Sequence, residues 1–95
     1  MRNEHPIDLT VTLPSGSSPN GAELRGYLED DLRTRAEVAR ADDCTMVVHA
    51  YRREEVEAIG DELVRKLTDI GMPDGVTVTW TGDDGEQVLR PVDIS

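Results

Sequence analysis

Residues 7–13 alternate strictly between apolar and polar side chains, and no other feature of the sequence constrains the fold as much. A period of two with β-branched residues predicts a β-strand that buries one face and leaves the other in water. Residues 76–81 repeat the pattern, with Trp80 on the apolar side and therefore expected in the core. A sheet covered on both faces would bury these threonine-rich sides, so we expect one open polar face. Its members would be Asp8, Thr10, Thr12, Thr77 and Thr79.

Two longer segments have the spacing of amphipathic helices instead. In residues 54–70 the apolar side chains recur at helical intervals, and Gly71 followed by Pro73 is a strong stop signal. Residues 22–41 carry a similar apolar stripe, which predicts one long helix with Tyr27 on its buried side.

Two further segments complete the predicted sheet. Residues 44–51 are mostly apolar with little alternation, which is typical of a strand flanked by other strands. Residues 86–92 follow a glycine-containing turn and would form a hairpin with residues 76–81. The element order is then β-α-β-α-β-β, and helical crossovers favour parallel strands. We therefore expect a single α/β (α+β) domain over residues 1–95, a two-layer sandwich with a four-stranded mixed sheet and two helices on one face.

The composition excludes several classes of partner. The chain has 10 Lys and Arg residues against 20 Asp and Glu residues, a formal net charge of −10. Nucleic acids and anionic membranes carry charge of the same sign, so we expect neither as a partner. No segment approaches the roughly 20 apolar residues of a membrane span. Residues 1–6 lack the apolar run of a signal peptide, so the expected location is the cytoplasm.

The loop at residues 16–21 precedes the first predicted helix, as a phosphate-binding loop would. A Walker A loop continues with lysine and a hydroxyl residue, whereas Ala22 and Glu23 follow here, and a carboxylate would repel phosphate. We therefore expect an ordinary loop whose end caps the helix. Either Ser18 or Asn20 could be the cap, the second with Glu23 bonding back to it.

No metal or catalytic constellation stands out in the sequence. His5 and His49 have no ligand neighbours at the short spacing of zinc sites. Cys44 lies five residues from His49, on the opposite face of a strand, so this pair does not suit nucleophilic catalysis. We expect Cys44 to be a small buried hydrophobe, and we expect no metal, no cofactor and no catalytic residue. A small enzyme, the least favoured alternative, would use Asp8, Thr10 or His49 near strand ends.

The net acidity is greatest in residues 71–95, which hold five acidic residues and one basic residue. A basic partner protein would dock there most naturally. The candidate partner-binding residues are Asp83, Asp84, Glu86, Gln87 and Arg90. An acidic inhibitor or nucleic-acid mimic is the alternative, and it predicts salt-sensitive capture of a basic protein. We also expect residues 87–92 to be an edge strand, which would allow homodimerisation or strand addition by a partner.

Two segments carry a resemblance to a known family. One is residues 22–28 (AELRGYL) in the first predicted helix, and the other is the closing hairpin, residues 76–88 (VTVTWTGDDGEQV). They resemble the effector-associated constant component family of bacterial conflict systems, small α/β partner domains encoded beside caspase-like or trypsin-like effectors. The resemblance implies a non-catalytic interaction or adaptor module in a bacterial defence or signalling system, with no catalytic residues.

Overall fold

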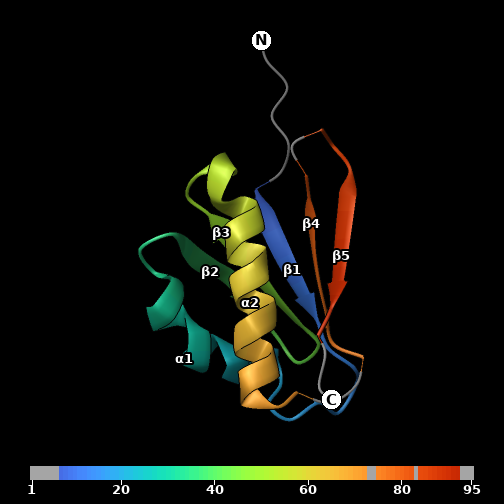
Figure 1. Cartoon of the computed structure of the whole chain (residues 1–95). Coiled ribbons are helices and arrows are strands. Elements are labelled where there is room, and N and C mark those ends of the chain that lie inside the picture. The colour runs from blue at the N-terminus through green and yellow to red at the C-terminus, as the bar shows by residue number, and fades with distance from the viewer. Residues whose placement is uncertain (1–6, 73–74, 83, 93–95) are drawn as a thin grey trace.

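In residues 7–72, 75–82 and 84–92, which the computed structural model describes, five antiparallel strands form one sheet and two α-helices cover one of its faces (Figure 1). In chain order the elements are β1 Asp8–Thr12, α1 Gly21–Leu32, β2 Ala36–Ala41, β3 Thr45–Ala50, a short 3-10 helix η1 Arg53–Glu55, α2 Val56–Ile70, β4 Thr77–Thr81 and β5 Gln87–Pro91. The strand order is β2-β3-β1-β4-β5. The α+β class with two helices is confirmed, whereas the four-stranded mixed sheet is wrong.

The fifth strand comes from the second half of the segment expected to be one helix over residues 22–41. Helix α1 ends at Leu32, and the N–H of Arg35 donates to the carbonyl of Leu32 (2.8 Å) in the turn that follows. Residues 36–41 then form β2. Beyond Leu32 a helix would turn mainly alanines toward the core, and alanine buries little apolar surface. As a strand, the same residues pair with β3 and form hydrogen bonds with the backbone groups along one side of β3.

Strand β2 also reverses the direction of the chain, which explains why the sheet is antiparallel throughout. Strand β1 pairs antiparallel with both of its neighbours, β3 and β4. The crossover through α2 does connect two strands of the same direction, but β1 lies between them. The expectation of parallel neighbours is therefore wrong, because it leaves out the β2–β3 hairpin between the two helices.

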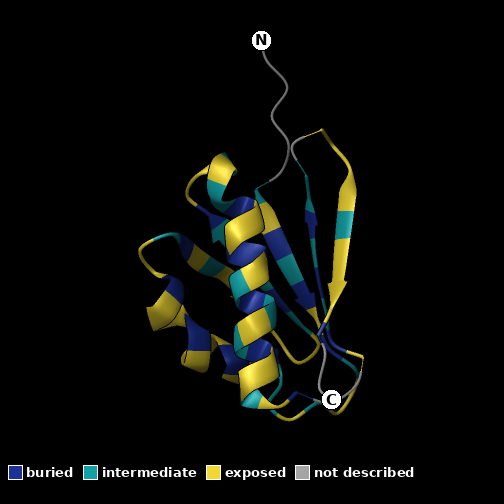
Figure 2. Ribbon diagram, in the orientation of Figure 1, coloured by how far each residue is buried: buried dark blue, intermediate teal, exposed yellow. Residues whose placement is uncertain are grey.

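The core lies between the helices and the face of the sheet that they cover (Figure 2). Its largest buried side chains include Leu9, Leu24, Leu28, Leu32, Met46, Ile59, Leu63, Leu67 and Met72. On the opposite face Thr10, Thr77 and Thr79 are half-buried. Asp8 and Thr12 are exposed there, so the expected open polar face is confirmed.

Two side chains expected in the core lie at the surface instead. Tyr27 is 60% exposed, because α1 buries Leu24 and Leu28 and leaves Tyr27 at the flank of that stripe. Cys44 is exposed in the turn between β2 and β3, a turn that one long helix over residues 22–41 would not create.

Both helices have the end signals that the sequence predicts. At the start of α1 the N–H of Glu23 donates to Oδ1 of Asn20, and the N–H of Asn20 donates to Oε1 of Glu23, both at 2.9 Å. This capping box shows that Asn20, and not Ser18, caps the helix. Helix α2 ends at Ile70, and the N–H of the next residue, Gly71, still donates to the carbonyl of Leu67 (3.2 Å). The φ of 87° at Gly71 is a left-handed conformation that suits glycine and ends the helix. Pro73, the other part of the stop signal, lies outside the described residues.

The carboxylate of Asp42 organises the turn between β2 and β3. Its Oδ1 accepts hydrogen bonds from the hydroxyl of Thr45 (2.6 Å), the N–H of Thr45 (3.0 Å) and the N–H of Cys44 (3.3 Å). These bonds, the Thr45 hydroxyl above all, hold the pKa of Asp42 below its ordinary value of 3.8.

We expect the Thr45→Val variant to raise the pKa of Asp42 toward 3.8, measured by NMR titration of the carboxyl carbon. Thr45→Ser, which keeps the hydroxyl, should leave the pKa low. Because folding depresses this pKa, the ionised carboxylate stabilises the fold above about pH 3.8, and that contribution is lost as the pH falls through the lower folded value. An unchanged titration in Thr45→Val would contradict this role of the hydroxyl.

Candidate functional site

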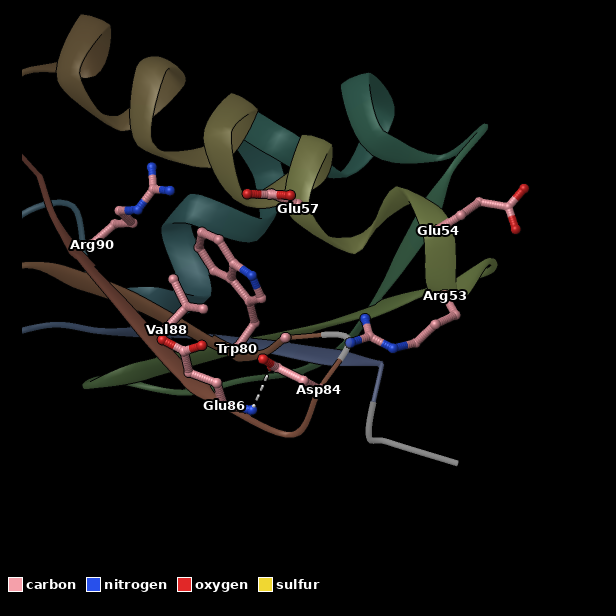
Figure 3. A pocket seen from close by; sticks show the side chains of 9 residues that line it. Arg53, Glu54, Glu57, Trp80, Asp84, Glu86, Val88 and Arg90 are labelled. Carbon is pink, nitrogen blue, oxygen red and sulfur yellow. Dashed lines mark hydrogen bonds between the residues drawn. The ribbon is translucent and has the colours of Figure 1, made fainter. Parts of the chain in front are cut away.

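A cavity of about 400 Å³ lies between the start of α2 and the β4–β5 hairpin (Figure 3). From the helical side it is lined by Arg53 and Glu54 of η1 and by Glu57 of α2. From the hairpin side it is lined by Trp80, Gly82, Asp84, Glu86, Val88 and Arg90. The fold therefore brings the beginning of one helix to the last two strands of the sheet.

Trp80 supplies the large apolar side chain of this cavity. Its ring packs on α2 at Gly60, where a Cβ atom would lie within 3.0 Å of three ring carbons. Val88 lies directly opposite Trp80 in the β4–β5 pairing. The guanidinium of Arg90 is 5.5 Å from the ring centroid, a cation–π distance. Only 3% of the surface of Trp80 is exposed. Its ring is thus fixed between α2 and the edge of the sheet.

Carboxylates outnumber arginines around the cavity. The four carboxylates are those of Glu54, Glu57, Asp84 and Glu86. The arginines have partners within the chain: Nη2 of Arg53 donates to the carbonyl of Thr81 (2.9 Å). Nη1 of Arg90 donates to Oδ1 of Asp61 (3.0 Å). In the described part of the chain no ion pair involves Glu57 or Glu86, so the cavity offers negative charge to an incoming group.

Three of the five predicted partner-binding residues, Asp84, Glu86 and Arg90, line the cavity. The N–H of Glu86 donates to Oδ1 of Asp84 (3.2 Å), which holds these two side chains near the turn. Gln87 lies on the other face of the sheet, where its side-chain oxygen accepts a hydrogen bond from Thr81 (3.3 Å). Asp83 lies outside the described residues.

The sequence alone does not place Arg53, Glu54 or Glu57 at this site. The helix dipole alone explains acidic residues at the start of a helix. It does not predict that these residues lie beside the β4–β5 hairpin. Only the packing of α2 across the sheet brings these three residues to the hairpin.

Strand β5 is the edge of the sheet beside the cavity, as predicted for residues 87–92. At one end of the β4–β5 ladder the N–H of Gly82 donates to the carbonyl of Glu86 (2.7 Å). At the other end the N–H of Val92 donates to the carbonyl of Val76 (2.9 Å). Hydrogen-bonded pairs recur every second residue in an antiparallel ladder, so the even-numbered residues of β5 direct their backbone groups toward β4.

The odd-numbered residues of β5 direct their backbone groups away from the sheet. Gln87 and Leu89 each offer an N–H and a C=O, and Pro91 offers a C=O only. The side chain of Leu89 lies on the open face of the sheet and is 59% exposed. No strand among the described residues pairs with this row of groups, which is a template for one more strand.

The opposite edge, β2, is less suited to pairing. Its register with β3 shifts between Val38 and Arg40, which indicates a bulge. Glu37 and Arg40 are exposed along it. Bulges and charged side chains discourage the addition of strands at edges, so β5 is the better acceptor of the two.

The residues of the enzyme alternative lie on the open face. Asp8 and His49 are directly opposite each other on β1 and β3, with Oδ1 of Asp8 2.6 Å from Nδ1 of His49. Thr10 contributes its carbonyl, which accepts a hydrogen bond from the hydroxyl of Thr79 (3.4 Å). None of these residues lines the cavity beside Trp80, so that cavity would not hold a substrate against them.

A second cavity, of about 270 Å³, lies between α1 and α2 and is crossed by the ion pair of Lys66 with Asp31 (3.2 Å). Within the described ranges no group of three or more His, Cys, Asp or Glu side chains is arranged to hold a metal ion. In the same part of the chain no helix has the length and apolar character needed to cross a bilayer.

No family model matches the chain, and no curated protein or solved structure matches it. The resemblance to the effector-associated constant component family therefore stays a prediction based on residues 22–28 and 76–88. The cavity and the β5 edge remain as the observations that can support a function.

Proposed function

We propose that the chain is a non-catalytic protein-interaction module and that a partner polypeptide binds it as an added strand along β5. The outward-facing backbone groups of Gln87 and Leu89 carry this proposal. Strand addition takes its affinity from such groups and its specificity from contacts with alternate side chains. The family resemblance supports a role as an accessory component of a bacterial defence or signalling system.

Features on both sides of β5 support an added strand. On the open face, the exposed side chain of Leu89 would meet an apolar side chain of the partner. On the helix side, the cavity beside Trp80 adjoins the same strand through Val88 and Arg90. The excess of carboxylates there, Glu86 among them, favours a basic side chain at that point of the partner.

Selection of short random peptides on the immobilised protein tests the proposal without a known partner. We expect selected peptides to shift the NMR amide signals of residues 87–91. We also expect their affinity to fall at least about tenfold on Leu89→Pro, because this variant loses an outward N–H and an apolar contact. Leu89→Ala, which keeps the N–H, should lose less. A failure to select any peptide, or peptides that bind Leu89→Pro as tightly as the parent chain, would contradict strand addition.

The second candidate function, an acidic inhibitor or nucleic-acid mimic that captures a basic protein, is favoured by the four carboxylates around the cavity. The same selection distinguishes it. Peptides rich in lysine and arginine that lose affinity steeply with added salt, yet bind Leu89→Pro normally, would support capture by charge alone. Affinity that is equal at low and high salt would count against it.

A further inference from the structure

We infer that the strand accepted by β5 is β5 of a second copy of this chain, paired antiparallel with Gln87 opposite Leu89. This inference rests on the proposed function of β5 as a strand acceptor and names its partner. The strand is complementary to itself in its backbone groups and in the side chains of its helix face.

Backbone hydrogen bonding selects this register. With Gln87 opposite Leu89 of the second copy, each such pair exchanges two N–H···O=C bonds, and the two-fold axis creates a second pair. In a register shifted one way, Gln87 would face Pro91, which has no N–H to donate. Shifted the other way, Leu89 would face Gly85, whose N–H already donates to the carbonyl of Gly82 (3.0 Å). Of these three registers, only the inferred one pairs both the N–H and the C=O of Gln87 and of Leu89.

The side chains on the helix face agree with the same register. Val88 would lie opposite Val88 of the second copy, and Glu86 would lie opposite Arg90 of the second copy. These are non-hydrogen-bonded positions, where Cα atoms approach to about 4.5 Å and opposite charges attract. The Glu86 carboxylate has no ion-pair partner among the described residues. Arg90 bonds Asp61 through Nη1, and a guanidinium carries several other N–H donors.

The open face gains from the pairing as well. There the amide side chain of Gln87 would lie beside Leu89 of the second copy and cover part of its exposed surface. The two-fold axis would pass perpendicular to the sheet beside Val88, so that the helices of both copies cover the same face of one continuous sheet. The cavity beside Trp80 in one copy would then adjoin the same cavity of the second copy across the paired strands.

The strength of the pairing follows from its size and charge. A strand of five residues buries far less than the roughly 1,200 Å² at the lower end of standard stable interfaces. Each copy also carries a formal charge of −10, which repels the other. We therefore expect a weak dimer that forms at millimolar concentration in physiological salt.

Disulfide trapping tests the register in a Cys44→Ser background, which removes the exposed native thiol. We expect Val88→Cys to form an intermolecular disulfide at least about tenfold faster than Leu89→Cys. Paired Cα atoms at position 88 would lie about 4.5 Å apart, within disulfide range, whereas those at position 89 would lie about 8 Å apart, beyond it. In denaturing urea the two rates should become equal. Equal rates in the folded protein, or a faster Leu89→Cys reaction, would overturn the inferred register.

Charge variants test the same pairing without new thiols. Glu86→Lys and Arg90→Glu each place like charges opposite one another, so each variant alone should remain monomeric where the parent chain dimerises. Mixed together, the two variants recreate opposite charges at both positions and should form a heterodimer. Thermal unfolding checks that each variant is folded, since Arg90→Glu also loses the bond to Asp61. Failure of the mixture to associate would contradict the pairing of Glu86 with Arg90.

Sedimentation of the parent chain separates this inference from the proposed function. A strict monomer at millimolar concentration would overturn the dimer. Peptides that bind along residues 87–91 and lose affinity on Leu89→Pro would in that case still support strand addition by another protein. Absence of both the dimer and such peptides would overturn both proposals.

Discussion

Gly60→Ala is expected to lower the free energy of unfolding by about 2 kcal/mol, although alanine suits a helix interior better than glycine does. An added Cβ at position 60 would lie within 3.0 Å of three carbons of the Trp80 ring. The ring lies in the core and is approached by Arg90 as well, so it cannot move aside without displacing its neighbours. Urea unfolding followed by the fluorescence of Trp80, the one tryptophan of the chain, measures the change.

Gly26→Ala is the matched control for this prediction. An added Cβ at Gly26, in α1, meets nothing within 4 Å, so only helix propensity acts and the variant should be more stable by about 0.5–1 kcal/mol. In a Trp80→Leu background, monitored by circular dichroism, Gly60→Ala should lose most of its cost because the smaller side chain leaves room. A Gly60→Ala variant as stable as Gly26→Ala would contradict the close packing of α2 on the ring.

Elements that bury one face against a single layer can be predicted from the sequence. Strands β1 and β4 lie within residues 7–13 and 76–81, where the alternation separates core from open face. Helix α2 lies within residues 54–70, because its apolar stripe matches the face that it buries. Each pattern reports burial of its own segment, and that burial is the larger part of what stabilises these elements.

Residues 36–41 show where this reasoning fails. Ala36, Ala39 and Ala41 are compatible with a helix or a strand, so the local pattern does not decide between them. Pairing with β3, a contact between different segments, decides the conformation. Because a missed strand reverses the direction of every later strand, this one omission also produced the wrong expectation of a mixed sheet.

The candidate site could be predicted in part for a similar reason. Charge density along the chain was sufficient to select Asp84, Glu86 and Arg90 of the hairpin. Charge density does not show which residues share a face, however, and Gln87 points to the opposite side of the sheet. The direction of the backbone groups of β5 depends on its register with β4, which only the structure supplies.

Val88→Pro is expected to lower the free energy of unfolding by about 3 kcal/mol, whereas Leu89→Pro should cost less than about 1 kcal/mol. The register directs the N–H of Val88 toward the carbonyl of Trp80 and the N–H of Leu89 into solvent. Proline at position 88 removes a ladder bond, leaves the Trp80 carbonyl unpaired and replaces a half-buried side chain. At position 89 proline removes an N–H that makes no ladder bond to β4.

Denaturant unfolding of both proline variants measures this difference, and Val88→Ala and Leu89→Ala separate the loss of each side chain from the loss of each N–H. If the two proline variants lost equal stability, or if Leu89→Pro lost more, the register of β5 would differ by one residue from the pairing of Val88 with Trp80. The outward groups would then belong to Val88 and Arg90, and Gln87 and Leu89 could no longer accept a strand from a partner or from a second copy.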